Sequence, residues 1–244
     1  MDALRRAEFM KRLTILAILV SLGALTALGR PVKMYDIKKL TADAKLVFVG
    51  RVKGVKPSGI TTSLSYPTWE GVVFEWLRVY VEVVEPIKGT KKGEIIQTAM
   101  LAVNASKGPR PIINAPGMLE PTNGNAFLFF LVPTTKTNLF AAITSPFDDD
   151  QAVFPLDRNS WKNTTFSKDS EYAERHRVTW SLVDDQGRIL PDGADSFRKT
   201  YAKEIATAGS NRVVYLQWEK YTNPGGWSHN IPKGMGPVTN VNKR

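Results

Sequence analysis

The feature that most constrains the fold is the run VVFEWLRVYVEVVEP at residues 72–86, in which side-chain character alternates along the chain. Odd positions from 73 to 83 are apolar except for Glu75, while the even positions form a mixed face that includes the aromatic rings of Phe74, Trp76 and Tyr80. Successive side chains of a β-strand point to opposite faces of its sheet. Alternation over such a length predicts a long, bent strand that serves a β-barrel.

The stretch GTKKG at residues 89–93 follows this run and predicts a turn. Pro86 has no N–H to donate, so we expect it to end the strand, while Gly89 and Gly93 supply the turn. A phosphate-binding loop would need a longer glycine spacing, a hydroxyl after the lysine and a helix that follows. Because strand-type sequence follows instead, a hairpin connection is the better interpretation.

Five further segments have the composition of strands. Residues 125–133 are apolar on both faces, which predicts a central strand that is covered on both sides. In residues 45–57 the parity breaks at Gly54, where a β-bulge would restore it. The strand candidates in chain order are residues 45–57, 93–103, 125–133, 139–145 as a hairpin partner of the preceding strand, and a small strand around 152–154.

The remaining segments predict helices and irregular chain. Residues 172–184 fit a helical stripe and also a strand; we favour a helix that Gly187 closes as its C-cap. The expected elements are a short helix at 34–44, loops at 57–71 and 104–125, a helix at 194–209 ended by glycine, a last strand at 211–221 and an irregular tail at 222–244.

The N-terminus has the arrangement of an export signal. Several basic residues precede an uncharged, apolar segment at residues 13–29, and Ala27 and Gly29 are small enough for cleavage before Arg30. The alternative is an uncleaved anchor, since a helix of this length rises about 25 Å, the short limit for crossing a membrane. In both cases residues 30–244 are expected outside the cytoplasmic membrane, on the periplasmic or extracellular side.

Composition excludes several kinds of site. The chain has no cysteine, which rules out disulfides, thiolate metal sites and a cysteine nucleophile, and it has only two histidines. The formal net charge is +10, but the basic residues are scattered in short pairs. Nucleic-acid binding would need a basic stripe or a recognisable motif, so we expect no nucleic-acid partner.

The candidate catalytic and metal-binding residues are weak. Asp148 to Asp150, with Asp157, could hold calcium, but they lack the spacing of a calcium loop, so an exposed acidic turn is the better interpretation. His176 and His229 are the only histidines, and no serine in a nucleophile motif accompanies them. We therefore expect no catalytic residue, no cofactor, no metal site and no enzymatic activity.

The aromatic face of the long strand is the best candidate for an interaction site. It carries Phe74, Trp76 and Tyr80, and Trp227 in the tail is a further aromatic that could lie along a partner or a membrane interface. Aromatic residues on a barrel face bind oligomers or sugars in OB-type folds and also serve protein interfaces. The alternative is that the C-terminal helices cover this face.

Three segments together carry a family resemblance: LTADAKLVFVGRVKGVKP, VYVEVVEPIKGTKKGE and GNAFLFFLVP, in this order. With them, residues 40–156 resemble exported bacterial proteins that have an OB-like barrel related to the tissue-inhibitor-of-metalloproteinase fold. The resemblance implies a five-stranded, partly open barrel outside the cytoplasmic membrane and no enzymatic activity. The animal inhibitors act through an N-terminal cysteine, which this chain lacks, so their mechanism is excluded.

We therefore predict a mainly β protein, an OB-like barrel with an N-terminal hydrophobic helix and an α+β C-terminal extension. The expected organisation is a signal peptide or anchor at 1–29, the barrel at 30–157, a helical extension at 158–209, and a final strand and tail at 210–244. We expect a non-catalytic exported binding protein with a protein partner. The alternative is an accessory subunit of a larger membrane complex, anchored through residues 13–29.

Overall fold

The computed structural model describes residues 35–63, 72–104, 106, 119, 121–144, 149–156, 171–214, 218–222 and 228–232 of the chain. These residues belong to one compact unit, Met34–Arg244, and the predicted signal or anchor at residues 13–29 lies outside them. In this part of the chain no helix is both long and apolar enough to cross a membrane.

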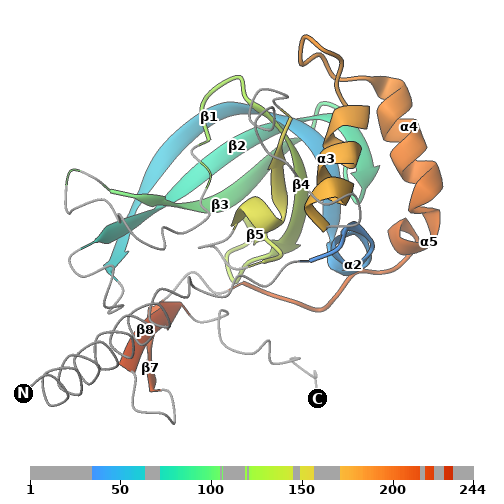
Figure 1. Cartoon of the computed structure of the whole chain (residues 1–244). Helices are drawn as coiled ribbons and strands as arrows, with labels where there is room; N and C mark the ends of the chain where they lie inside the picture. Colours follow the sequence, from blue (N-terminus) through green and yellow to red (C-terminus); the bar gives the residue numbers. More distant parts are fainter. Residues whose placement is uncertain are drawn as a thin grey trace, which may run out of the picture. The chain divides into compact units, whose positions relative to one another are not determined.

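The described residues form a closed five-stranded β-barrel, which confirms the predicted mainly β class (Figure 1). The strands follow one another in the order β1-β2-β3-β5-β4, and β4 pairs with β1 to close the barrel. All pairs are antiparallel except β3–β5, which is parallel, and β6 adds to β4. Their bounds are β1 Leu46–Ser63, β2 Val73–Lys88, β3 Ile95–Val103, β4 Ala126–Pro133, β5 Phe140–Ala142 and β6 Val153–Pro155.

Two strands run farther than the sequence predicted. β1 continues past Pro57 to Ser63, so the loop expected from residue 57 is wrong in its first part. β2 continues past Pro86 to Lys88, which corrects the prediction that this proline ends the strand. Its missing N–H is tolerated because the β1–β2 register is irregular where Phe48 faces Pro86. The predicted turn that follows is confirmed by the positive φ of Gly89 and Gly93, 71° and 79°.

The predicted bulge in β1 is also present. The register between β1 and β2 shifts between Val52 and Gly54, so an extra residue is accommodated at this point of β1. β4 pairs with β1 only over the part of the strand that precedes the bulge, from Leu46 to Arg51. The bulge therefore marks the end of the pairing between β1 and β4. Beyond it, β2 is the only described strand that pairs with β1.

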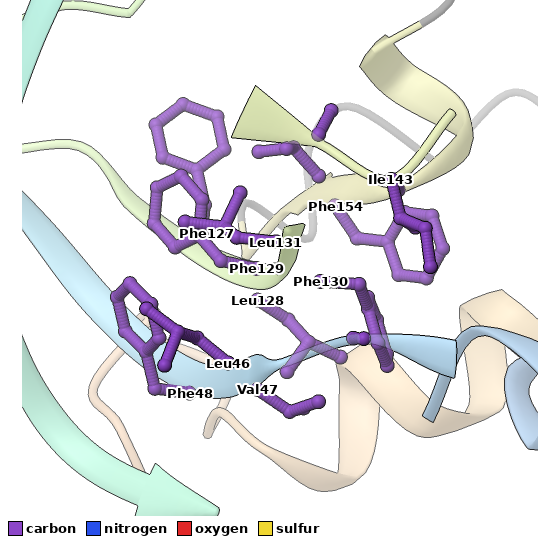
Figure 2. Packing of buried hydrophobic residues seen from close by; sticks show 14 of the residues in the cluster. Leu46, Val47, Phe48, Phe127, Leu128, Phe129, Phe130, Leu131, Ile143 and Phe154 are labelled. Atoms are coloured by element: carbon purple, nitrogen blue, oxygen red, sulfur yellow. The ribbon is translucent and has the colours of Figure 1, made fainter. Parts of the chain in front are cut away.

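β4 is buried on both faces, as its apolar sequence predicted. On one face Phe129 stacks on Phe48 of β1, with ring centroids 5.0 Å apart. On the other face the Phe130 ring lies beside the Phe154 ring of β6, with ring centroids 5.5 Å apart (Figure 2). The centroid of the ring of Phe197, a helical residue, lies 6.4 Å from that of Phe130. Each fully buried phenylalanine contributes about 1.5–3 kcal/mol to folding. β4 is thus the central element of the core.

The α-helices of the described residues lie grouped at one side of the strands (Figure 1). Residues 171–181 are helical, which confirms the helix that we favoured there, but Gly187 is not its C-cap and lies in the loop after it. The predicted helix at 194–209 begins earlier, with a proline at its first position, and is interrupted at Tyr201. The bounds are α2 Ile37–Asp43, α3 Glu171–Ser181, α4 Pro191–Thr200 and α5 Ala202–Ile205.

Lys88, the last residue of β2, joins two of these helices to the barrel. Its ammonium group donates hydrogen bonds to the carbonyl oxygens of Thr41 and Ala42 at 2.7 and 3.1 Å, at the end of α2. It also donates to Glu204 O at 3.3 Å and to Thr207 Oγ1 at 3.2 Å, at the end of α5. Helix C-termini carry partial negative charge, which favours a cation there. Burial and the neighbouring Lys45 lower the pKa of Lys88 from its usual range.

The chain after α5 returns to the barrel. Val214 forms a parallel bridge with Thr134, so the last strand predicted at 211–221 begins here as a single bridge. A separate hairpin follows, made of β7, Trp218–Thr222, and β8, Ser228–Pro232. The irregular tail predicted from residue 222 is therefore wrong for residues 228–232. The turn-forming sequence NPGG at residues 223–226 was the signal that could have indicated this hairpin.

Gly50 tests the packing inside the barrel. A Cβ atom at this position would lie 2.4 Å from Val81 Cγ1 and 2.7 Å from Phe48 Cε2, closer than packed side chains allow. We expect Gly50→Ala to lower the free energy of unfolding by about 1–3 kcal/mol in urea denaturation. Gly54→Ala is the matched control, because its Cβ would meet only the Tyr80 ring at 4.0 Å, and we expect a change within about 0.5 kcal/mol. Equal effects of the two substitutions would contradict this packing.

Candidate binding face

The residues of the predicted aromatic face differ in their exposure to solvent. Phe74 and Trp76 are 0% and 1% exposed, whereas Tyr80 is partly exposed; Trp227 lies outside the described residues. Two of the predicted interaction residues therefore contribute to the protein's own packing and are not open to a partner. The prediction that a partner binds this face stays a prediction, and Tyr80 is the described residue that can carry it.

The helices that we considered as a cover for this face dock elsewhere on β2. Arg198 of α4 donates two hydrogen bonds to Pro86 O, from Nε at 3.0 Å and from Nη2 at 2.7 Å. At the usual rise of a strand, Pro86 lies about 33 Å along β2 from Trp76. The docking of α4 therefore does not account for the burial of Phe74 and Trp76.

Tyr80 lies on a stretch of the sheet where β1, β2 and β3 present one shared face. The β2–β3 ladder is regular from Phe74 to Glu82, so the even-numbered side chains of β2 remain on one side. Tyr80 faces Gly54 on β1 and Gln97 on β3. The Tyr80 ring lies beside Gly54, and its Cδ2 atom is 4.0 Å from the position that a Cβ atom would take there, an ordinary van der Waals distance.

Cationic side chains surround Tyr80. Lys56 faces Arg78 directly across the β1–β2 pair, and Lys56 Nζ lies 5.5 Å from the centroid of the Tyr80 ring. This geometry is that of a cation–π contact. Lys53 lies nearby and forms an ion pair with Glu82 at 3.1 Å. We call this surface the cationic face, and it consists of Lys53, Lys56, Arg78 and Tyr80.

Within the cationic face, the opposition of Lys56 and Arg78 is unfavourable for stability. Like charges placed directly opposite each other in an antiparallel pair are destabilising. Lys56 and Arg78 occupy such positions, and both are exposed. Within the described ranges of the chain, the ion pairs include none that joins a carboxylate to either side chain. The pair therefore lowers stability and can attract an anionic group from outside.

Two of the other candidate residues, His176 and Asp149, make contacts within the protein itself. The centroids of the His176 and Trp180 rings lie 3.7 Å apart, and burial lowers the pKa of His176 from its usual range. His229 lies on β8, and Asp148 and Asp157 are outside the described residues. Asp149 is only 1% exposed and accepts a hydrogen bond from Leu119 N at 2.9 Å, so the exposed acidic turn is wrong for this residue.

Arg175 is a buried charge that the sequence did not indicate. It is 1% exposed on α3, and its guanidinium donates to Gln151 Oε1 at 2.6 Å and to Tyr35 O at 2.7 Å. The guanidinium carbon also lies 5.1 Å from the centroid of the Phe154 ring. In the sequence Arg175 stands among other charged residues and resembles a surface position. Its contacts join α3 to β6 and to the start of α2, a structural role.

No cluster of histidines and carboxylates that could hold a metal ion occurs in the part of the chain that the structure describes. Comparison with protein-family models, with curated proteins and with solved structures gave no match to this chain. The interpretation of the cationic face therefore rests on its own geometry and charge.

Replacing Arg78 tests how much stability the opposition of Lys56 and Arg78 costs. We expect Arg78→Glu to raise the free energy of unfolding by about 0.2–1 kcal/mol, because the repulsion with Lys56 becomes an attraction. Arg78→Gln, which only removes the repulsion, should give a smaller gain. Urea denaturation at low salt measures both, and the gain should shrink in about 1 M salt. A loss of stability with Arg78→Glu would show that Arg78 stabilises the fold.

Proposed function

We propose that the protein is a non-catalytic, exported binding protein that recognises a protein partner through the cationic face. The observation that carries this proposal is the Lys56–Arg78 pair beside Tyr80. A barrel with a densely packed core keeps two like charges opposite each other at a cost to its own stability. Such an arrangement is understandable if a partner supplies the compensating negative charge.

The barrel topology supports an OB-like interpretation. β1 pairs with both β2 and β4, and β3 pairs in parallel with β5, which gives a five-stranded closed barrel. OB-type barrels bind their ligands on the face of strands 2 and 3. Tyr80 of β2 and Gln97 of β3 face each other on the outside of the sheet. The cationic face thus lies where this class of barrel offers a binding surface.

Export is proposed from the N-terminal segment. Basic residues followed by the uncharged residues 13–29 favour translocation of everything after them. The same segment is the specific observation behind a second candidate function. If it is retained, the protein is an accessory subunit of a membrane complex, and its barrel binds partner subunits outside the cytoplasmic membrane.

The two candidates are separated by the mass of the chain isolated from its native cells. A cleaved signal gives a chain that starts at Arg30 in the soluble exported fraction, which supports the free binding protein. A chain that keeps residues 13–29 and fractionates with membranes supports the anchored subunit. Recovery from the cytosol with an intact N-terminus would contradict both.

Site-specific crosslinking tests the binding role itself. A photoreactive amino acid at position 80 should crosslink to one defined protein in the native cells. The same amino acid at Lys203, an exposed position on α5, is the matched control and should not give this product. Equal crosslinking from both positions, or none from position 80, would contradict binding at the cationic face.

A further inference from the structure

β1 has an open edge beside the cationic face. Val52 is the last residue of β1 that bonds to the β4 side: its N–H donates to Asn125 O at 2.9 Å and its carbonyl accepts from Gly124 N at 2.8 Å. Beyond it, none of the strands in the described ranges pairs with this edge of β1. Lys53, Lys56 and Pro57 are exposed there. This part of the strand is therefore accessible from solvent.

The hydrogen-bond pattern shows which backbone groups face that edge. Val83 N donates to Glu94 O and Asn104 N donates to Val73 O, so the odd-numbered residues of β2 point their backbone groups toward β3. By the alternation of an antiparallel ladder, the even-numbered residues of β2 point toward β1. Their partners on β1 are Gly54 and Lys56, which therefore point back toward β2.

Val55 lies between these two residues, so its N–H and carbonyl point to the open side. The carbonyl of Pro57 lies on the same side, and its ring nitrogen has no hydrogen to leave unpaired. An exposed edge with an available N–H and carbonyl is a template for an added strand. Its short length limits pairing to a few residues.

Charge decides which strand can be added. Lysine and proline on an edge discourage pairing with other strands. A second copy of this chain would bring the same cations to the edge, and the chain as a whole has a formal net charge of +10. Repulsion therefore disfavours self-association. An acidic segment converts the same cations from a barrier into an attraction, which is how an edge selects one class of partner.

We propose that the edge of β1 from Lys53 to Pro57 binds an acidic peptide segment in extended conformation. The segment adds as a strand through Val55, and its carboxylates contact Lys56 and Arg78. This inference rests on the proposed function, because it names the chemistry of the partner bound by the cationic face. The Tyr80 ring, already in contact with Lys56, provides an apolar surface for a side chain between the carboxylates.

Binding of a designed probe to the full-length protein tests this proposal. The probe is a short fluorescent peptide in which glutamate alternates with valine, and fluorescence anisotropy measures its dissociation constant. A second peptide has the same sequence with N-methylated amides at alternate residues, which removes strand pairing on one edge and keeps every charge. We expect N-methylation to weaken binding about fivefold for each hydrogen bond lost.

Variants of the protein test the charges. Lys56→Glu combined with Arg78→Glu should weaken peptide binding about tenfold, and the effect should fall as salt is raised. The matched control, Lys203→Glu on α5, should leave the affinity unchanged. The N-methylated peptide needs no variant, so the test holds even if the double variant unfolds.

Three results would overturn the proposal. Equal affinity for the normal and N-methylated peptides would mean that no strand is added. Absence of binding up to about 1 mM peptide would exclude an acidic segment. Binding of anionic lipid vesicles or single-stranded DNA that depends on Lys56 and Arg78, without peptide binding, would assign the face to another polyanion. If either of the first two results is obtained, crosslinking from position 80 to a protein in native cells would still support the proposed function. Failure of the acidic-peptide inference is therefore distinguishable from failure of the binding role.

Discussion

The pairing of β1 with β4 is the interaction on which the rest of the structure depends. It closes the barrel, and it does so over the first part of β1 alone, from Leu46 to Arg51. Because β4 is buried on both faces, it needs a filled barrel interior on one side and a cover on the other. Phe154 of β6 and Phe197 of α4 provide that cover beside Phe130. The bulge that follows in β1 then separates the closed barrel from an edge that β4 does not reach.

Much of the barrel could be predicted because strand signals are local. The alternation in β2 indicated a long strand, and the apolar run of β4 indicated a strand that is covered on both sides; the structure confirms both strands. The prediction that Pro86 ends β2 was wrong because the effect of a proline depends on the neighbouring strand. Its missing N–H matters only where a regular partner strand would accept a hydrogen bond, and the β1–β2 register is irregular at Pro86. The burial of Phe74 and Trp76 was not predicted, because alternation indicates which side chains share a face but not whether that face is covered.

The contacts that fix the helices could not be predicted, because their partners are distant in the sequence. Arg175 bonds to a carbonyl 140 residues earlier, and Lys88 bonds to carbonyls 47 residues before it and 116 residues after it. No local pattern marks either residue as buried. The same limit applies to the candidate site. Tyr80 was predicted from its own strand, whereas the opposition of Lys56 and Arg78 follows only from the register of two strands.

The open edge is the point at which fold and proposed function meet, and amide hydrogen exchange measures it directly. Residue-resolved exchange by NMR on the full-length protein should find a rapidly exchanging amide at Val55 beside a protected amide at Lys56. The first N–H points away from the sheet and the second toward β2, so neighbouring residues should differ strongly. Strong protection of both amides would contradict the account, because it would mean that another segment already occupies the edge of β1.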